Sequence, residues 1–323
     1  MKLWQRRAVR QMMLSVLPLV LICVGLLVYL LTTAAGINDQ QSAATATATA
    51  TVTAEGDGSR GLDFQFADST GQLRPARLVF PQAGHVPKGT TFTVHYVPGD
   101  PGRVYAGADE LDLRFRNLVS GAQFALLVLL VGVLTTAFRL WRRIAAERRP
   151  AQTYPVRWAQ FRRGLIRRSW LVVEDQAAKR EWWLPVYWQP GLASLLAGTP
   201  CKVHGNPAVD RLVVVEVHGQ PVWPAGRRRP TKPRRRKGDW IDGTVKWTKT
   251  AAKQQERDGG PELEHVPLVR HLSGDVALVL PAPVLGLLWA YVDGSGVTGF
   301  AVATALVASV LLWLPGVFGS DPT

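Results

Sequence analysis

Four long apolar stretches without charged residues dominate the pattern of this chain. They are residues 14–35, 118–138, 276–292 and 297–318. A helix needs about 20 predominantly apolar residues to cross a hydrocarbon core about 30 Å thick. The pattern therefore predicts an integral membrane α+β protein with four transmembrane helices.

The first stretch has a second interpretation, a cleaved signal peptide. Lys2, Arg6, Arg7 and Arg10 resemble the basic start of such a peptide, and small alanines follow the apolar run. Signal cores are usually about 7 to 15 residues long. Because the run without charge extends from Arg10 to Asp39, a permanent span is favoured.

The third stretch also leaves an alternative open. Only seventeen residues separate Asp275 from Asp293, and Pro281 and Pro283 lie among them. Proline removes a backbone donor and favours a kink. The segment is predicted to span, with a buried core helix or a re-entrant segment as alternatives.

Positive charge on short flanking segments predicts the orientation. Basic residues precede the first stretch, and a second group follows the second stretch, namely Arg139, Arg142, Arg143, Arg148 and Arg149. Residues 1–13, 139–275 and 319–323 are therefore predicted to be cytoplasmic, and residues 37–117 extracytoplasmic. Residues 37–117 hold seven basic and nine acidic side chains, whereas residues 139–275 hold twenty-seven and thirteen. The overall charge of +14 thus belongs to the predicted cytoplasmic side.

The predicted outer segment has the alternation of short strands. Residues 43–53 alternate alanine and threonine, which is typical of a flexible stalk or of the start of a strand, and a spacer that runs into a strand is favoured. Residues 62–67, 77–80 and 91–97 alternate or group apolar residues between turn signals. Two prolines and two glycines in residues 98–102 favour a tight reversal. We expect a small β-sandwich or barrel, which must be stabilised by packing because it contains no cysteine.

Two motifs in this region carry a resemblance to a known family. They are Phe-Gln-Phe-Ala-Asp-Ser-Thr-Gly at residues 64–71, and Gly89 followed by Val-His-Tyr-Val-Pro-Gly-Asp-Pro at residues 94–101. Over residues 14–138 the chain resembles bacterial, in particular actinobacterial, membrane proteins of unknown function with a small extracytoplasmic β domain between two transmembrane helices. The resemblance implies a topology and a β module, and it implies no functional residues.

The predicted cytoplasmic segment begins with a basic stretch. Residues 156–170 set Trp158, Phe161 and Leu165 near one helical face among five arginines. A helix is predicted here, either on the anionic inner surface of the bilayer or as the cap of a domain. Apolar runs at residues 171–174, 182–188, 201–204 and 211–217 then predict a β-rich domain.

Residues 227–237 carry eight basic side chains and two prolines, a composition that predicts a disordered loop. A solvated loop is one interpretation, and attraction to anionic lipid headgroups is the other. Nucleic-acid binding is disfavoured because no recognised nucleic-acid fold accompanies the loop. The candidate headgroup-binding residues are Arg162, Arg163, Arg167, Arg168, Arg227, Arg228, Arg229, Lys232, Arg234, Arg235, Arg236 and Lys237.

No motif for catalysis, a cofactor or a metal is found. The six histidines do not pair at ligand spacing with each other or with the two cysteines, and no phosphate-binding loop or nucleophile elbow occurs. The spans contain no ionisable group of the kind that transport usually needs. Small residues four apart, such as Ala301 and Ala305, favour close helix packing or a homo-oligomer, and ordinary span composition explains them equally well.

These observations predict a non-enzymatic multi-pass protein of the bacterial plasma membrane with both termini in the cytoplasm. It would act as a scaffold or accessory subunit that binds a protein partner and anionic lipid. The alternative is a transporter or membrane enzyme with a site near Pro281 and Pro283. A sensor that relays the state of the outer domain is a third hypothesis, although no recognised output domain follows.

Overall fold

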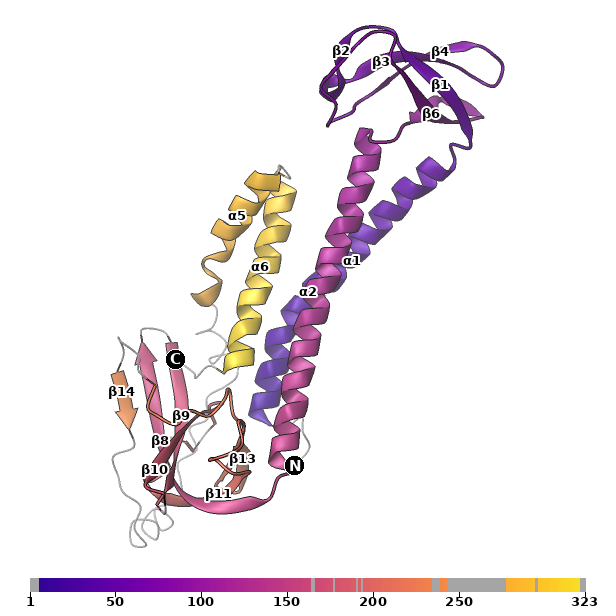
Figure 1. Cartoon of the computed structure of the whole chain (residues 1–323). Coiled ribbons are helices and arrows are strands. Elements are labelled where there is room, and N and C mark those ends of the chain that lie inside the picture. The colour runs from indigo at the N-terminus through magenta and orange to yellow at the C-terminus, as the bar shows by residue number, and fades with distance from the viewer. Residues whose placement is uncertain are drawn as a thin grey trace. The chain divides into compact units, whose positions relative to one another are not determined.

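The computed structural model of the chain describes residues 6–163, 166–176, 178–189, 191–192, 194–233, 239–242, 277–293 and 296–319 (Figure 1). The chain forms two compact units, one from Cys23–Val128 and the other from Met1–Ile22 with Leu129–Thr323. All twelve tryptophans of the sequence fall in the second unit. We therefore call the two the tryptophan-free unit and the tryptophan-rich unit.

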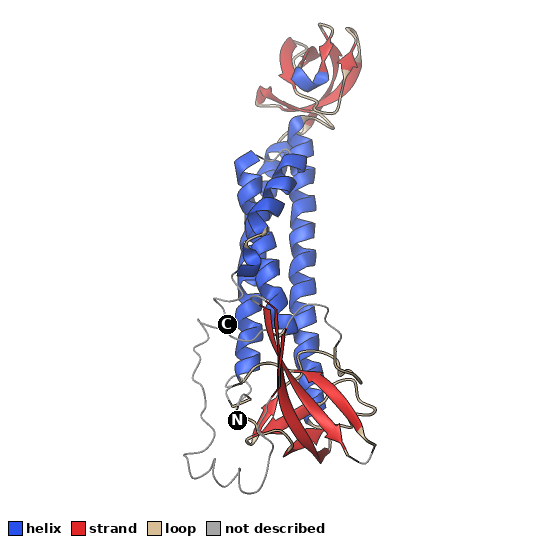
Figure 2. Cartoon of the chain, turned by 90° about the vertical axis from the view of Figure 1, so that its left-hand side faces the viewer, coloured by secondary structure: helices blue, strands red, loops and turns tan. Residues whose placement is uncertain are grey.

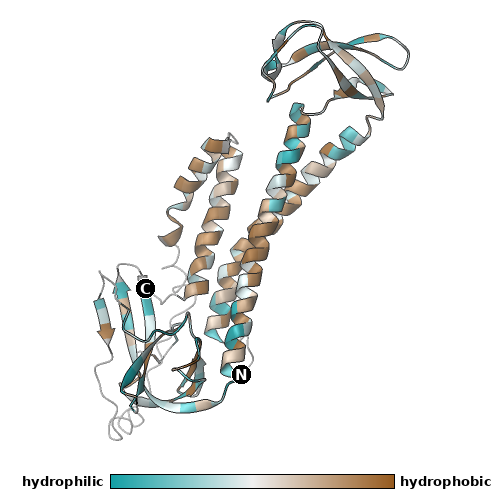
Figure 3. Cartoon of the chain, in the orientation of Figure 1, coloured by the Kyte–Doolittle hydropathy of each residue, from teal (hydrophilic) through white to brown (hydrophobic). Residues whose placement is uncertain are grey.

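Three helices are long and apolar enough to cross a membrane. They are α1 (Arg7–Ser42), α2 (Glu110–Glu147) and α6 (Gly296–Phe318), and Figure 3 shows their long apolar stretches. At most 22% of each apolar window is buried within the protein. The helices predicted at residues 14–35, 118–138 and 297–318 are thus confirmed as helices, and their exposed apolar sides require a lipid or protein environment.

The third predicted span is shorter than expected. A 3₁₀ turn, η3 (Ala277–Val279), precedes a helix of 12 residues, α5 (Ala282–Asp293). At 1.5 Å per residue, α5 extends about 18 Å, which is less than the apolar thickness of a bilayer. Pro281 and Pro283 lie at the start of this helix and do not interrupt it, because the first turn leaves its N–H groups unpaired in any case.

The tryptophan-free unit contains a five-stranded antiparallel sheet with the order β4-β3-β1-β6-β7. The edge strands β4 and β7 also contact each other, so the sheet curls towards a barrel. A two-stranded ribbon, β2 with β5, and a 3₁₀ turn, η2 (Gly58–Arg60), complete it. The bounds are β1 Ala46–Val52, β2 Gly56–Asp57, β3 Leu62–Ala67, β4 Leu73–Leu78, β5 His85–Val86, β6 Thr91–Val97 and β7 Asp100–Tyr105.

Strict alternation explains how this sheet forms its core. Leu62, Phe64 and Phe66 of β3 are buried, and the residues between them are exposed. The Ala/Thr segment forms the central strand β1, where the fully buried Ala50 leaves room for aromatic rings. The strands predicted at residues 62–67 and 91–97 have the observed bounds, whereas the one predicted at 77–80 begins four residues earlier, at Leu73.

The tryptophan-rich unit contains a seven-stranded antiparallel sheet with the order β10-β9-β8-β11-β12-β13, and β14 pairs with β8 (Figure 2). The long strand β8 pairs with β11 through its first half and with β14 near its end. The bounds are β8 Ala151–Arg163, β9 Ile166–Asp175, β10 Arg180–Pro185, β11 Thr199–His204, β12 Val214–Val217, β13 Gln220–Val222 and β14 Asp239–Asp242.

The helix predicted over residues 156–170 is wrong, because this stretch lies in the paired strands β8 and β9. Val156 and Trp158 face one hydrophobic cluster, and Ala159 and Phe161 face another. Apolar residues on both faces of a strand remove the simple alternation that identifies a half-buried strand. Some apolar residues of this stretch also fall at helical spacing, and the prediction of a helix rested on them.

Candidate functional site: an arginine-lined cavity

The end of α2 supplies the first wall of the candidate site. Arg139, Arg142 and Arg143 follow immediately after the apolar run that ends at Phe138. Thr135 and Phe138 precede them at helical spacing, so these five residues lie along one side of the helix. The same side therefore changes from apolar to strongly basic within about two turns.

The β domain supplies the facing wall. Arg168 and Trp170 are two residues apart on β9, so they lie on the same face of the sheet. The chain after β13 runs beside the edge strand β10 and is held there by backbone hydrogen bonds. Ala225 N donates to Pro185 O at 2.8 Å, and Arg229 and Trp183 exchange two N–H···O bonds, each of 2.8 Å.

These bonds correct one prediction about the basic segment 227–237. Residues 227–233 are ordered against the sheet, and cationic side chains of the segment lie on tryptophan rings. The Arg228 guanidinium lies 4.3 Å from the Trp182 ring centroid, and Lys232 Nζ lies 4.9 Å from that of Trp240. Composition alone predicted disorder, but the tryptophan surface provides partners that a solvated loop lacks.

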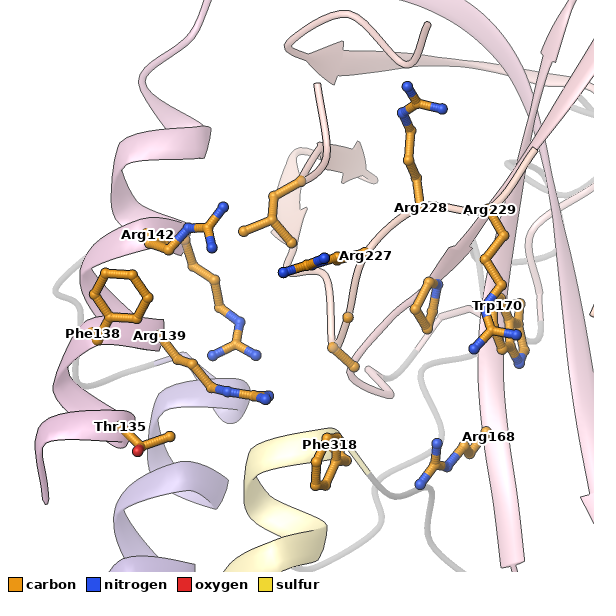
Figure 4. A pocket seen from close by; sticks show the side chains of 15 residues that line it. Thr135, Phe138, Arg139, Arg142, Arg168, Trp170, Arg227, Arg228, Arg229 and Phe318 are labelled. Atoms are coloured by element: carbon orange, nitrogen blue, oxygen red, sulfur yellow. The ribbon is translucent and has the colours of Figure 1, made fainter. Parts of the chain in front are cut away.

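Between the two walls lies a cavity of about 610 Å³ (Figure 4). Its fifteen lining residues include seven arginines and no aspartate or glutamate. In Figure 4, Arg139 and Arg227 extend from opposite walls towards the space between them, while Arg228 points away. The arginines are Arg139, Arg142 and Arg143 from α2, Arg168 from β9, and Arg227, Arg228 and Arg229 after β13.

Some of these guanidinium groups are engaged by neutral partners. The buried Arg143 donates from Nε to Pro224 O at 2.8 Å and from Nη2 to Tyr187 Oη at 3.0 Å. Arg139 donates from Nη1 to Val317 O at 2.7 Å and lies over the ring of Phe318. These contacts hold the side chains in place but do not neutralise their charge.

Three of these guanidinium groups have no polar partner within the part of the chain that the structure describes. They are the half-buried Arg142, which lies over the ring of Phe138 on its own helix, the exposed Arg227, and the exposed Arg229, which lies over the ring of Trp170. Across the described residues, six of the seven cavity arginines form no ion pair with a carboxylate. The six are Arg139, Arg142, Arg143, Arg227, Arg228 and Arg229. These six arginines therefore concentrate positive charge at the cavity, and no carboxylate of the described residues pairs with them.

Tyr187 connects the base of the cavity to the last helix. Its hydroxyl donates to Gly316 O or Val317 O, at 2.9 and 3.0 Å, while it accepts from Arg143. Complete burial raises the pKa of this phenol above its ordinary value, so it stays protonated and able to donate. The β domain, α2 and the end of α6 thus share one buried hydrogen-bond network.

The cavity brings together four of the candidate headgroup-binding residues, namely Arg168, Arg227, Arg228 and Arg229. Arg162 and Arg167 do not line it, Arg163 lies on β8, and Lys232 lies over tryptophan rings nearby. Arg234, Arg235, Arg236 and Lys237 lie outside the described residues.

Sequence reasoning missed Arg139, Arg142 and Arg143 as site residues and used them only to predict orientation. Their spacing of three and four positions, directly after an apolar run, was the signal that could have identified a basic helix face.

Among the described residues, no group of three or more His, Cys, Asp or Glu could hold a metal ion. Comparisons with protein-family models, with curated proteins and with solved structures find no match to this chain. The site must therefore be interpreted from its own chemistry.

Proposed function

We propose that this chain is a multi-pass protein of the bacterial plasma membrane that binds an anionic phospholipid through the arginine-lined cavity. It would serve there as a scaffold or accessory subunit for a protein partner. The observation that carries the proposal is a cavity with seven arginines and no carboxylate, next to the end of an apolar helical run.

The chemistry of the cavity favours phosphate over other anions. A guanidinium presents several N–H donors in a plane, and this arrangement matches the oxygens of a phosphate group. The lining also contains Phe138, Phe318 and Leu212, which offer apolar surface beside the charges. A lipid headgroup with its adjoining acyl chains combines these two requirements.

The position of the cavity along the helices supports a membrane lipid as the source of the bound phosphate group. Phe138 ends the charge-free run of α2, and Arg139 contacts Val317 at the end of α6. A headgroup layer is expected at this level if the apolar runs cross the bilayer. Each basic residue near an anionic leaflet contributes about 1 kcal/mol of attraction before screening.

The same contact supports the predicted topology of four passes. The carboxyl end of α6 lies beside the end of the apolar run of α2, so both helices would end on one side of the membrane. The chain must then cross once more between β14 and α6. The apolar helix α5 packs against α6 and is the described segment available for this crossing, with neighbouring residues extending its length.

Under this topology both termini and the tryptophan-rich β domain are cytoplasmic, and the tryptophan-free β module is extracytoplasmic. Each sheet then offers a surface on a different side of the membrane, which suits an interaction subunit or a homo-oligomer better than a catalyst. Nucleic acid is not part of the proposal.

Native mass spectrometry of the protein released from nanodiscs tests the proposal. The nanodiscs would contain phosphatidylcholine with phosphatidylglycerol, and the wild-type chain should retain phosphatidylglycerol preferentially. Replacement of Arg142 and Arg227 by glutamine should reduce this retention, because their donors have no polar partner among the described residues.

The matched control replaces two arginines of the tryptophan-free unit, Arg60→Gln with Arg103→Gln, and removes the same net charge. It should retain the lipid as the wild type does. Equal retention of the neutral and the anionic lipid by the wild type, or an equal loss in the control, would contradict the proposal.

A further inference from the structure

The arginines of the cavity form two groups on separate elements. Arg139, Arg142 and Arg143 belong to α2, whereas Arg168, Arg227, Arg228 and Arg229 belong to the β domain. Figure 4 shows Arg139 and Arg227 directed towards the space between the walls. A ligand in this space therefore meets cationic groups from two sides.

The donors that remain open are divided between these walls. A guanidinium has five N–H donors. Arg143 uses donors on all three nitrogens, and Arg228 uses two on the carbonyl oxygens of Asp210 and Ala208. The side chains of Arg142 on one wall, and of Arg227 and Arg229 on the other, donate to no described residue, so each wall retains a guanidinium that is open to a ligand.

A single phosphodiester, with one negative charge, does not match this arrangement. The cavity of about 610 Å³ lies within the size range of sites that enclose a whole organic ligand. One phosphoryl group at either wall would leave the other wall without a counter-charge. Two linked phosphoryl groups would supply an anion to each wall at once.

We propose that the cavity binds one ligand that carries two phosphoryl groups, one held by the α2 arginines around Arg142 and the other by Arg227 with its neighbours. The inference rests on the proposed function and specifies the ligand class of the same site. The shared chemistry is a pair of covalently linked phosphoryl groups, which a lipid of the cardiolipin type carries as two phosphodiesters and soluble diphosphate carries as an anhydride. In both cases the ligand bridges α2 and the β domain.

The test uses the full-length protein in phosphatidylcholine nanodiscs and measures dissociation constants for four probes. These are cardiolipin, phosphatidylglycerol at equal total phosphate, inorganic diphosphate and inorganic phosphate. We expect cardiolipin to bind at least about tenfold more tightly than phosphatidylglycerol, which corresponds to one additional charge-assisted contact.

Variants assign the preference to the two walls. Arg142→Ala and Arg227→Ala should each lower cardiolipin affinity to that of phosphatidylglycerol, and the double variant should add little because either loss breaks the bridge. Neither side chain has a described polar partner, so thermal unfolding without ligand should stay unchanged. Arg103→Ala, on the tryptophan-free unit, is the matched control and should leave the preference intact.

The outcomes separate this inference from the proposed function. Equal affinity for cardiolipin and phosphatidylglycerol overturns the two-phosphate inference and leaves anionic lipid binding in place. Tight binding of diphosphate without binding of either lipid supports the two-phosphate site and contradicts the lipid source. Failure to bind any of the four probes overturns both.

Discussion

The two units differ in how their arginines are paired with carboxylates. In the tryptophan-free unit, five arginines each lie within 4 Å of an aspartate oxygen, namely Arg60, Arg74, Arg77, Arg103 and Arg116. The tryptophan-rich unit also pairs Arg6, Arg149 and Arg157 with acidic residues. Six of the seven cavity arginines, by contrast, have no carboxylate partner among the described residues. Because exposed ion pairs contribute only about 0 to 1 kcal/mol, the difference indicates where an external anion fits and does not indicate which unit is more stable.

The largest expected effect comes from the cores of the two units. Trp183 in the tryptophan-rich unit and Phe64 in the tryptophan-free unit are both almost fully buried. Replacement of either by alanine should cost about 3 to 5 kcal/mol. Hydrogen exchange resolved by region should show loosening of the strands around the substituted residue and unchanged protection in the other unit. Loss of protection in both units after either change would contradict their independence.

A second comparison concerns how closely helices approach each other in the two units. A Cβ at Gly286 of α5 would lie 2.8 Å from the Thr304 backbone nitrogen of α6, so the helices would have to separate. A Cβ at Gly121 of α2 would meet only the end of the Leu30 side chain, at 3.4 Å. Gly286→Ala should therefore cost about 1 to 3 kcal/mol of stability. Gly121→Ala, measured by the same thermal unfolding in detergent, should be nearly neutral, and a reversed order would contradict the packing of α5 on α6.

The buried network below the cavity gives a third prediction. Tyr187→Phe removes the donor to the carbonyl oxygens of α6 and leaves Arg143 without one acceptor. The expected loss is about 1.5 to 3 kcal/mol, because one of the broken bonds involves a charged group. Tyr154→Phe is a control, since that hydroxyl donates only to the exposed Gln152. Equal stability of the two variants in chemical denaturation would contradict the role of Tyr187.

The smallest effect should be a pH dependence of the tryptophan-free unit that Asp68 produces. The hydroxyl of Thr70 donates to Asp68, and together with the Arg74 side chain it lowers the pKa of this carboxyl from 3.8 to about 2. A carboxyl whose pKa is lower in the folded state stabilises the fold above its unfolded pKa, and this stabilisation is lost as the pH falls towards the folded pKa. Stability should thus decline between about pH 4 and 2.

Asp68→Asn should flatten this part of the acid unfolding curve, as followed by far-UV circular dichroism. Asp68 lies outside the tryptophan-rich unit, so the unfolding of that unit, which has its own carboxyl of lowered pKa in Glu147, should keep its pH profile in this variant. If the acid unfolding curve keeps its slope in the Asp68 variant, this carboxyl is excluded as the source of the pH dependence.

The sequence predicted those features that one local pattern determines. Charge-free runs predicted α1, α2 and α6, and strict alternation around Phe64 and Phe66 predicted β3. The β8–β9 hairpin was missed because both of its faces are buried, with Trp158 on one face and Phe161 on the other. Such a pattern depends on what covers the second face, and a single sequence does not contain that information.

The candidate site was predicted in part for a similar reason. The density of basic residues identified Arg227, Arg228 and Arg229, but their ordered backbone depends on the pairing of Arg229 with Trp183, which lies 46 positions earlier. The contribution of α2 depends on the packing of that helix against the β domain through Arg143 and Pro224. Contacts between residues far apart in sequence therefore convert a basic segment into a cavity.

The most direct test of the central claim is a cryo-electron microscopy structure of the protein in nanodiscs that contain cardiolipin. The account predicts headgroup density inside the cavity, with one phosphate beside Arg142 and another beside Arg227. An empty cavity at a resolution that shows lipid headgroups elsewhere on the helices would contradict it.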